Sequence, residues 1–239
     1  MIGRLEAGFE RQRRFIADAS HELRTPITII NLEAARGLAS ESASGDSKRA
    51  LEVIEVEGGR MARLVNDLMT LARMDSGQAI LHFEDLDLGE VALEAIGRLS
   101  TLAKNQGVEL CAGELPELTV RGDAQYLLLM ISNLIENGIK YSGKGQSVRV
   151  EASAAEYDGI LRVSDTGPGI PPEHLPAVFD RFYRADTARP QNDGEAASPS
   201  GSGLGLSIVA WIVHAHHGTI RVDSQVDQGA TFIVTLPLS

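Results

Sequence analysis

Apolar residues recur every three to four positions along residues 3–40, and this spacing constrains the fold more than any other feature of the chain. The seam occupies the positions Leu5, Phe9, Gln12, Ile16, Ala19, Leu23, Pro26 and Ile30. Its steps alternate between four and three residues, which is the heptad pattern of a long helix that packs against other helices. Pro26 has no backbone N–H to donate, so we expect it to bend this helix locally.

A second heptad seam follows the segment 40–46, whose composition is typical of a turn. This seam occupies the positions Leu51, Ile54, Gly58, Met61, Val65, Leu68 and Ala72. Two seamed helices joined by a short turn form an antiparallel hairpin, and a single hairpin cannot cover both of its seams. We therefore expect two copies of the chain to pair as a homodimer with a four-helix bundle. Gly58 and Gly59 either permit close helix packing or mark a weak point for bending.

The sequence pattern changes after Gly77, so we divide the chain into domains 1–78 and 79–239. In the second domain, short segments rich in β-branched residues alternate with helical ones. The predicted strands are 108–110, 118–120, 148–152, 160–164, 219–223 and 231–236, and the predicted helices are 89–104, 123–141 and 205–216. The expected fold class is α+β, with a helical hairpin followed by an α/β sandwich that contains a mixed sheet.

The formal net charge of −11 is unevenly distributed along the chain. Residues 1–77 carry 11 basic and 12 acidic side chains, whereas residues 78–239 carry 11 and 21. No run is rich in Lys or Arg, so we do not expect nucleic acid as a partner. Cys111 is the only cysteine, which excludes an internal disulfide. No apolar run approaches the ~18 residues that a membrane-spanning helix needs.

The first motif that carries chemistry lies on the first helix and reads Phe15-Ile-Ala-Asp-Ala-Ser-His21-Glu22-Leu-Arg-Thr25-Pro26. His21 is two residues from the seam positions on either side, and at ~100° per residue it points away from the seam. Thr25 lies one turn further along the same outer face. A neutral imidazole is a nucleophile near pH 7, and an exposed one can be reached by a donor on another domain.

Two motifs in the second domain carry groups that suit a nucleotide. Asn133 and Asn137 are four residues apart on one predicted helix and share a face, and an amide oxygen is a hard ligand of the kind Mg²⁺ prefers. Asp165 follows a predicted strand and opens the string Asp165-Thr-Gly167-Pro-Gly169. An ionised aspartate only accepts hydrogen bonds, so it can bind an exocyclic amino group such as adenine N6. The two glycines allow the backbone to approach a flat ligand.

A glycine-rich segment, Gly201-Ser-Gly203-Leu204-Gly205, opens the predicted helix 205–216. Backbone N–H groups at a helix start bind phosphate well. The segment is not a P-loop, because no Gly-Lys-Ser/Thr follows. The preceding stretch, 185–200, is rich in Ala, Ser, Pro, Asp and Gly, which is typical of a mobile loop.

Taken together and in this order, the motifs resemble those of bacterial sensor histidine kinases, and the resemblance extends from about Arg4 to Pro237. It implies that 1–78 is a dimerisation and histidine phosphotransfer domain. It also implies that 79–239 is a catalytic ATP-binding domain with the Bergerat fold, which is shared with DNA gyrase. ATP and Mg²⁺ are the implied ligands, and loop 185–200 corresponds to a lid over ATP.

The histidine-box resemblance assigns roles in the first domain. His21 would receive the phosphoryl group, and Glu22 would polarise His21 or accept its proton. Thr25 would position a water when the enzyme acts as a phosphatase.

The resemblance to the asparagine box implies that Asn137 ligates Mg²⁺, that Lys140 meets phosphate and that Tyr141 lies near the nucleotide. Asn133 belongs to the same box, and Gly138 stands where the family usually has alanine.

Two further resemblances complete the expected nucleotide site. Thr231 resembles the residue that supports the adenine-binding aspartate, here Asp165. The string from Phe179 to Arg184 resembles the phenylalanine box, in which either Arg181 or Arg184 meets the γ-phosphate.

Two other functions compete with that of a histidine autokinase. A gyrase-like conformational ATPase would carry a glutamate at position 133 to activate water, and Glu136 lies at a different angle on the helix. A non-catalytic dimeric scaffold would show a decayed ATP site. His214, His216 and His217 do not share one helix face, so we do not expect them to bind metal.

The family resemblance also implies partners and a location. The phosphoryl group would pass from His21 to an aspartate of a response regulator. Residues 5–14 read as the end of a longer signalling helix. We therefore expect a full-length protein that is anchored through a preceding region at the cytoplasmic face of the bacterial inner membrane, with this part in the cytoplasm.

Overall fold

The computed structural model describes residues 2–39, 44–185 and 201–239. The chain forms two compact units, Met1–Ser76 and Gly77–Ser239. The turn residues 40–43 and nearly all of the expected lid, 185–200, lie outside the described residues. Within the described ranges, no helix combines the length and the apolar character needed to cross a bilayer.

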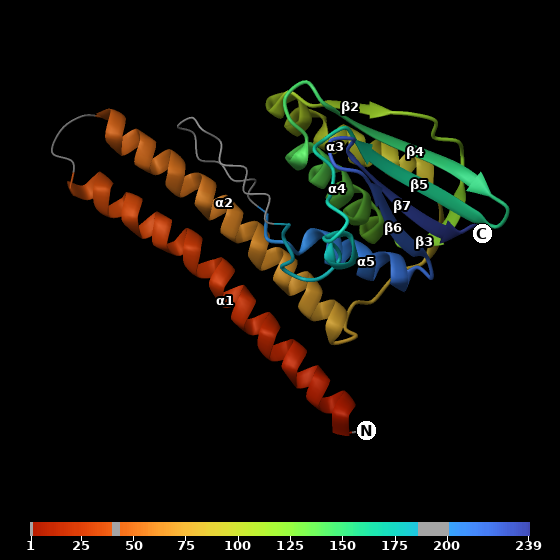
Figure 1. Ribbon diagram of the computed structural model, residues 1–239, viewed down its shortest axis with the longest axis horizontal. Coiled ribbons are helices and arrows are strands. Elements are labelled where there is room, and N and C mark those ends of the chain that lie inside the picture. The colour runs from red at the N-terminus through yellow and green to blue at the C-terminus, as the bar shows by residue number, and fades with distance from the viewer. Residues whose placement is uncertain (1, 40–43, 186–200) are drawn as a thin grey trace. The chain divides into compact units, whose positions relative to one another are not determined.

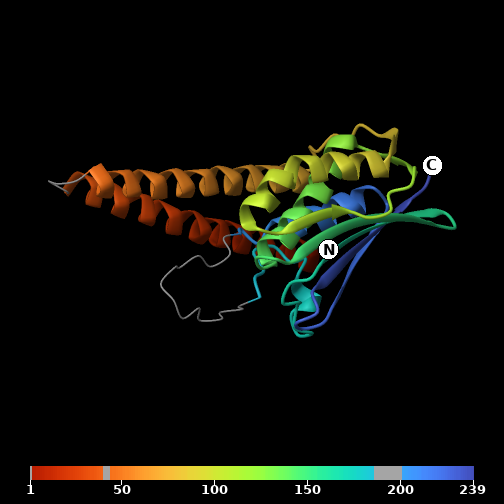
Figure 2. The same ribbon diagram turned by 90° about the horizontal axis from the view of Figure 1, so that it is seen from above.

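The first unit is a hairpin of two long helices, α1 (Ile2–Ala39) and α2 (Ser44–Asp75), which lie side by side (Figure 2). The predicted hairpin is thus confirmed. Helix α1 continues through Pro26, whose side chain is buried. The buried apolar residues of α2 are Ala50, Leu64, Leu71 and Met74.

The predicted seam of α2 does not coincide with the face that this hairpin buries. Leu51 and Val65, both seam positions, are 65% and 40% exposed, whereas their neighbours Ala50 and Leu64 are buried. The apolar band on α2 is therefore wider than one partner helix can cover. An added Cβ at Gly58 or Gly59 would meet nothing within 4 Å, so packing within the hairpin does not require glycine there.

The second unit is built on a five-stranded mixed sheet with the order β2-β4-β5-β7-β6 (Figure 1). Its strands are β2 (Glu109–Ala112), β4 (Ser147–Ala155), β5 (Asp158–Asp165), β6 (Thr219–Ser224) and β7 (Ala230–Pro237). Strands β2 and β4 run parallel, and the other neighbours are antiparallel. The predicted mixed sheet is therefore confirmed.

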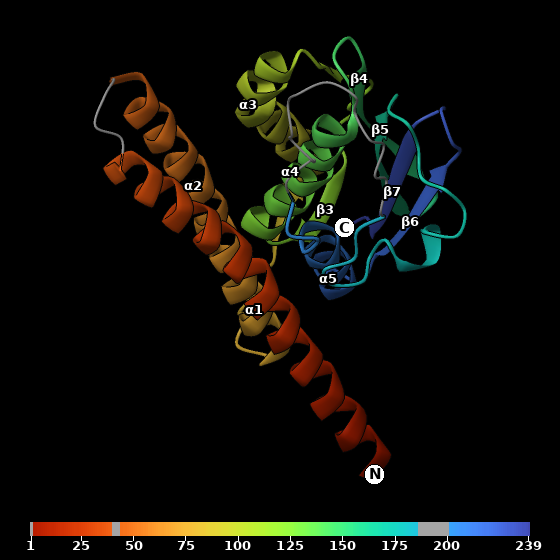
Figure 3. The same ribbon diagram turned by 60° about the vertical axis from the view of Figure 1, so that its left-hand side comes forward.

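Three helices pack on one face of this sheet: α3 (Leu88–Gln106), α4 (Ala124–Tyr141) and α5 (Gly205–Ala215) (Figure 3). A 3-10 turn, η1 (Leu175–Ala177), lies between β5 and α5 in the chain. The core between helices and sheet consists mostly of buried aliphatic side chains from the three helices and the central strands, together with Phe232 of β7. Helix α5 is almost wholly apolar on its inner side, which explains its burial.

A second sheet of two strands, β1 (Glu84–Asp87) and β3 (Thr119–Gly122), was not fully predicted. Strand β3 was expected, but β1 has the sequence Glu-Asp-Leu-Asp and carries no strand pattern. Antiparallel pairing with β3 holds β1 in place. Asp87 then caps α3, because its Oδ1 accepts a hydrogen bond from the Gly89 N–H at 2.9 Å.

A buried histidine joins α4 to α5. The N–H of Asp123 donates to Nε2 of His216 at 3.0 Å, so the neutral ring carries its proton on Nδ1 and donates to the Ile212 carbonyl at 2.8 Å. Only 3% of His216 is exposed. Burial lowers the pKa of His216 below the ordinary 6.5, against the opposing effects of the Ile212 hydrogen bond and the Asp123 charge; the nearby His217 lowers it further.

This environment predicts an acid-sensitive fold. Because the folded state holds His216 neutral, its contribution to the free energy of unfolding is present above pH 6.5 and is lost as the pH falls from there towards the lowered pKa. The contribution of His216 to the free energy of unfolding cannot change by more than about 1.4 kcal/mol per pH unit, which is the limit for the uptake of one proton. Urea unfolding of the wild type and His216→Gln at several pH values should show a steeper loss in the wild type. Parallel curves would contradict the assignment.

Candidate functional site

The turn after β5 holds the carboxylate of Asp165 in a fixed orientation. Its Oδ1 accepts hydrogen bonds from the Gly167 N–H at 2.9 Å and the Ala230 N–H at 3.3 Å. Both bonds go to one oxygen, so Oδ2 is left for a ligand. Burial raises the pKa of Asp165 above 3.8, although the two amide hydrogen bonds oppose this shift. The carboxylate is therefore a desolvated acceptor that is already aimed.

Two glycines make this turn possible. Gly169 has φ +70° and Gly229 has φ +84°, a region that favours glycine. A Cβ on Gly169 would overlap the Gln225 carbonyl, and one on Gly229 would overlap the carbonyl of Asp165. Gly169 was predicted as a site residue, and the structure shows that it packs the turn against the loop before β7.

Thr231 makes its hydrogen bond to the residue before Asp165, and its expected support of the aspartate stays a prediction. Its hydroxyl donates to Ser164 Oγ at 3.0 Å, because the two residues face each other across the β5–β7 ladder. The protein group that supports Asp165 is the backbone N–H of the preceding residue, Ala230. Successive side chains point to opposite faces of a strand. Neighbouring residues therefore do different things here: the Ala230 backbone bonds to Asp165, and the Thr231 side chain bonds to Ser164.

The polar face of α4 lies beside this turn. Asn133 donates through Nδ2 to the Leu129 carbonyl at 2.9 Å, and its Oδ1 lies so near Gly205 that an added Cβ there would be 2.7 Å away. Asn137 is half-buried, and its amide makes no hydrogen bond within the described part of the chain. Asn137 therefore has its whole amide available to a ligand, whereas Asn133 keeps only its oxygen, and the role of Asn137 as the metal ligand stays a prediction.

The end of α4 approaches both the glycine-rich segment and the Asp165 turn. The ammonium of Lys140 donates to the Tyr141 hydroxyl at 3.0 Å and lies against Gly201, where a Cβ would overlap it. A Cβ on Gly167 would lie 3.1 Å from the Tyr141 carbonyl. The structure thus brings Lys140, Tyr141, Gly167 and Gly201 together.

Gly138 lies where α4 comes closest to the sheet. It is buried, and an added Cβ would lie 3.0 Å from Val148 Cγ2 and 3.7 Å from the Cβ of Asp165. The absence of a side chain therefore lets the helix approach β4 at the level of the carboxylate.

The N-terminus of α5 is prepared for an anion. No side chain caps the helix, so its first amides keep free N–H groups. Leu204 was predicted as a ligand residue, but the whole residue is buried, and its N–H donates to the Ser202 hydroxyl at 3.3 Å. Gly203 has φ +68°, and its carbonyl accepts from the Phe182 N–H at 2.9 Å. That bond ties the glycine-rich segment to the string 179–184.

The two arginines of that string, Arg181 and Arg184, are both exposed. Phe179 anchors the string through an edge contact with Phe232, with ring centroids 6.3 Å apart. Phe179 and Phe182 hold the string in place. Their contacts do not distinguish Arg181 from Arg184 as the residue that meets a ligand.

His21 lies on the other unit, in the middle of α1. Its imidazole and the Thr25 side chain are exposed, Glu22 is half-buried and Pro26 is buried. The exposed histidine agrees with the outward direction predicted from the helical repeat. Within the hairpin, His21 is therefore open to a donor from outside.

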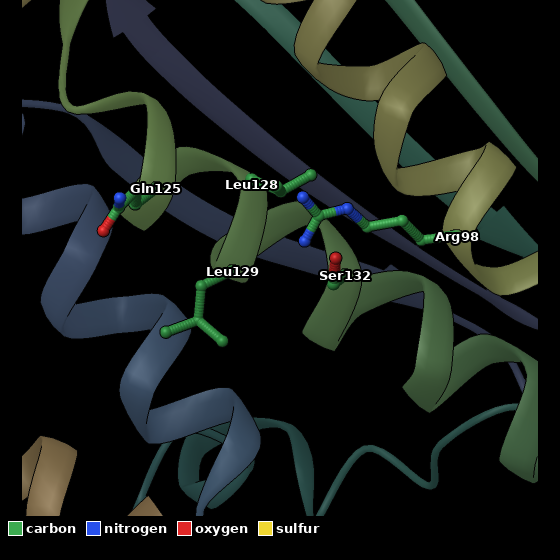
Figure 4. Close-up of a pocket in the computed structure, with 5 residues that line it drawn as sticks. All are labelled: Arg98, Gln125, Leu128, Leu129 and Ser132. Carbon is green, nitrogen blue, oxygen red and sulfur yellow. The ribbon is translucent and has the colours of Figure 1, made fainter.

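A surface pocket between α3 and α4 does not coincide with these groups. Figure 4 shows Arg98 of α3 extending towards Leu128 and Ser132 of α4. The lining residues are Arg98, Gln125, Leu128, Leu129 and Ser132, and none was predicted as a site residue. We place the site instead on the face of α4 that carries Asn133, Asn137 and Lys140, because these side chains lie beside the Asp165 turn and the glycine-rich segment.

Two family models match the chain. Residues 11–77 match the His Kinase A (phospho-acceptor) domain, and residues 122–239 match the histidine kinase-, DNA gyrase B-, and HSP90-like ATPase. The sensor histidine kinase CusS of Escherichia coli (strain K12) is 37% identical over 238 residues, which are 99% of this chain and 48% of CusS. The chain spans about half the length of the curated relatives it matches.

Solved structures of similar proteins agree with this match. The mycobacterial sensor histidine kinase MprB is 30% identical with a TM-score of 0.54, over 66% of this chain and 98% of that one. The Acinetobacter baumannii histidine kinase AdeS is 25% identical with a TM-score of 0.70, over 92% of this chain and 98% of that one.

The geometry of Asp165 predicts opposite effects of one substitution on stability and on binding. In Asp165→Asn, the amide oxygen can keep both backbone hydrogen bonds, while a neutral Nδ2 replaces the free oxygen. The apo protein should melt slightly higher, because a desolvated charge is removed. Affinity for Mg-ADP should fall by at least about 100-fold, because a buried donor would then face the adenine amino group. Scanning calorimetry measures the melting temperature, and titration calorimetry measures the affinity for Mg-ADP. An unchanged affinity would refute the assignment of Asp165 as the residue that binds adenine.

Proposed function

This chain belongs to the sensor histidine kinase family, and we propose that it transfers the γ-phosphoryl group of ATP to its own His21. The phosphoryl group then passes to an aspartate of a response regulator, and the same protein removes it from the regulator by hydrolysis. The observation that carries the proposal is the pairing of an exposed His21 on one unit with an aimed Asp165 and an unbonded Asn137 on the other. Residues 1–78 would form the dimerisation and phosphotransfer domain, and residues 79–239 the catalytic domain.

The adenine end of ATP would meet Asp165. The Oδ2 of Asp165 accepts a hydrogen bond from the exocyclic amino group, while Gly167 and Gly169 form the turn that aims this carboxylate. Tyr141 lies at the edge of this region and would contact the nucleotide. Thr231 contributes through Ser164 and the strand, and not through a direct hydrogen bond to the carboxylate.

The triphosphate would extend towards the N-terminus of α5. The amides of the glycine-rich segment, at Gly201, Gly203 and Gly205, would donate to its oxygens, and Leu204 would hold the segment in place through its buried side chain. Gly203 shapes this segment through its bond to Phe182. Lys140 adds a positive charge, and one of the two arginines, Arg181 or Arg184, meets the γ-phosphate.

The residues present fit a magnesium ion held jointly by protein and nucleotide. Asn137 offers a free amide oxygen, and Asn133 lies one turn away with its oxygen towards Gly205. The described residues include no group of three or more His, Cys, Asp or Glu side chains that could hold a metal. Mg²⁺ bound by Asn137 and phosphate oxygens would neutralise charge that develops on the phosphates.

His21 would act as the nucleophile. One ring nitrogen attacks the γ-phosphorus, a nitrogen–phosphorus bond forms, and the bond to the bridging oxygen breaks with its electron pair leaving on ADP. Glu22, next to His21, polarises the ring or accepts its proton. Thr25, one turn away on the same face, would hold the water that attacks a regulator's aspartyl phosphate.

A gyrase-like ATPase fits the residues less well. Position 133 is an asparagine, so this chain has no carboxylate there to activate water, and Glu136 lies on the exposed side of α4. A non-catalytic scaffold would not need a buried, ionisable Asp165 that reduces stability. Both alternatives leave the exposed His21 unexplained.

We also propose that the hairpin pairs with a second copy. Leu51, Val65 and Met69 of α2 expose 65%, 40% and 53% of their surface. On α1, Ile27 and Leu32 expose 43% and 50%. A second hairpin would cover this apolar band and complete a four-helix bundle. We further propose that a region outside this sequence anchors the full-length protein at the cytoplasmic face of the inner membrane.

The proposed function predicts where labelled phosphate goes. After incubation with γ-labelled ATP, the wild type should carry acid-labile label, and His21→Gln should carry none. The affinity of this variant for ATP should stay within about two-fold, because His21 belongs to a different unit from the residues that would bind ATP. His214→Gln, which changes another exposed histidine, is the matched control and should be labelled normally. Label that survives in His21→Gln, or free phosphate as the main product, would contradict the proposal.

The proposed pairing predicts a charge-sensitive dimer. In analytical ultracentrifugation the wild type should sediment as a dimer. Val65→Glu should raise the dissociation constant by more than about ten-fold, because an unpaired charge would be buried between the hairpins. Asn66→Glu adds the same charge at a position that points about 100° away, and should leave the dimer intact. A monomeric wild type would exclude the four-helix bundle.

A further inference from the structure

The second unit contains a network of buried polar groups that the proposed reaction does not use. Asp123 is 6% exposed and His216 is 3% exposed. Each makes hydrogen bonds to more than one element, and they are bonded to each other. Buried polar groups that are fully bonded hold their neighbours in a fixed arrangement.

Asp123 divides its two carboxylate oxygens between two tasks. Oδ1 caps α4, because it accepts hydrogen bonds from the N–H groups of Gln125 at 3.0 Å and Tyr126 at 3.1 Å. Oδ2 accepts a hydrogen bond from the His82 N–H at 2.9 Å. His82 belongs to the linker, residues 77–83, which follows α2 and leads into β1. One side chain therefore ties the linker to the start of α4.

At the end of α5, His216 likewise uses its two ring nitrogens to bond to two different segments. Its Nε2 accepts from the Asp123 N–H, and its Nδ1 donates to the Ile212 carbonyl in the last turn of the helix. The ring also contacts Phe83 of the linker, with centroids 5.2 Å apart. Gly122 permits this approach, since a Cβ there would lie 2.9 Å from His216 Cδ2.

Helices α4 and α5 pack antiparallel, so the network and the phosphate site lie at opposite ends of the pair. Asp123 meets His216 at one end, Tyr126 and Trp211 have ring centroids 5.9 Å apart in between, and Asn133 meets Gly205 at the other end. A helix is stiff along its axis, so a displacement of one end moves the other.

We propose that Asp123 and His216 are positioning residues that couple the linker to nucleotide binding. The inference rests on the proposed ATP site. A docked linker holds the α4–α5 pair in the arrangement that binds nucleotide, and bound nucleotide in turn holds the linker in place. This reciprocity is required of any coupling between two binding equilibria.

Amide hydrogen exchange at His82 tests the proposal in the full chain, with and without Mg-ADP. In the wild type, nucleotide should slow this exchange by about five-fold or more, the lower range of coupling between sites. Asp123→Asn keeps an oxygen for the α4 cap but presents an NH₂ group to the His82 N–H. In this variant exchange should be fast with or without Mg-ADP, and the dissociation constant for Mg-ADP should rise by a similar factor.

Asp87→Asn is the matched control. Asp87 also caps a helix, but its bonds from Gly89 and Leu118, at 2.9 and 3.0 Å, both go to Oδ1, which asparagine retains. This variant should behave as the wild type. In His216→Gln, the side-chain amide reaches the position of Nε2, so Mg-ADP should still slow exchange at His82. In His216→Asn, the shorter amide reaches only the position of Nδ1, so Mg-ADP should no longer slow this exchange.

The outcomes separate this inference from the proposed function. If Mg-ADP binds the wild type but does not change exchange at His82, the coupling is overturned and the nucleotide site stands. The coupling is also overturned if Asp123→Asn keeps the wild-type response, or if Asp87→Asn loses it. Failure of Mg-ADP to bind the wild type at all would overturn both.

Discussion

The second unit depends on the burial of one face of α4 against the five-stranded sheet. The wholly buried side chains of this face are Leu127, Met130, Ile131, Leu134, Ile135 and Ile139. Because the helical repeat is fixed, burial of this face also fixes the direction of the polar face. Asn133, Asn137 and Lys140 are therefore aimed by the apolar packing beneath them, and Gly138 sets how closely that packing brings them to Asp165.

Periodicity predicted the helices and most of the strands, because long amphipathic patterns survive any detail of packing. It did not predict β1, whose acidic residues form a strand only because β3 is available as a partner. The heptad spacing of α2 was recognised, but spacing alone does not tell which side of the helix the hairpin buries, and Ala50 and Leu64 are buried beside the exposed seam residues. A broad apolar band allows several neighbouring seams, and the partner surface decides which of them becomes buried.

The candidate site was predicted where side-chain chemistry is visible in the sequence, as at Asp165, Asn137 and Lys140. It was not predicted where the role of a backbone atom depends on which residues face each other across the sheet. The Ala230 N–H donates a hydrogen bond to Asp165, and the identity of the alanine side chain does not predict that bond. The bond between Asp123 and His216 joins residues 93 positions apart, and only the aspartate, placed directly before a helix, carried a recognisable signal.

The order of the elements has a consequence for how the protein is made. The hairpin is complete once Asp75 has left the ribosome, whereas β7, which ends at Pro237, lies between β5 and β6 and closes the sheet last. At 5–20 residues per second this interval lasts about 8–30 s. During that time each nascent chain presents an apolar hairpin before its nucleotide site exists. In the proposed homodimer, neighbouring ribosomes on one messenger RNA would supply the nearest partners, and pairing of hairpins on nascent chains would precede the ability to bind ATP.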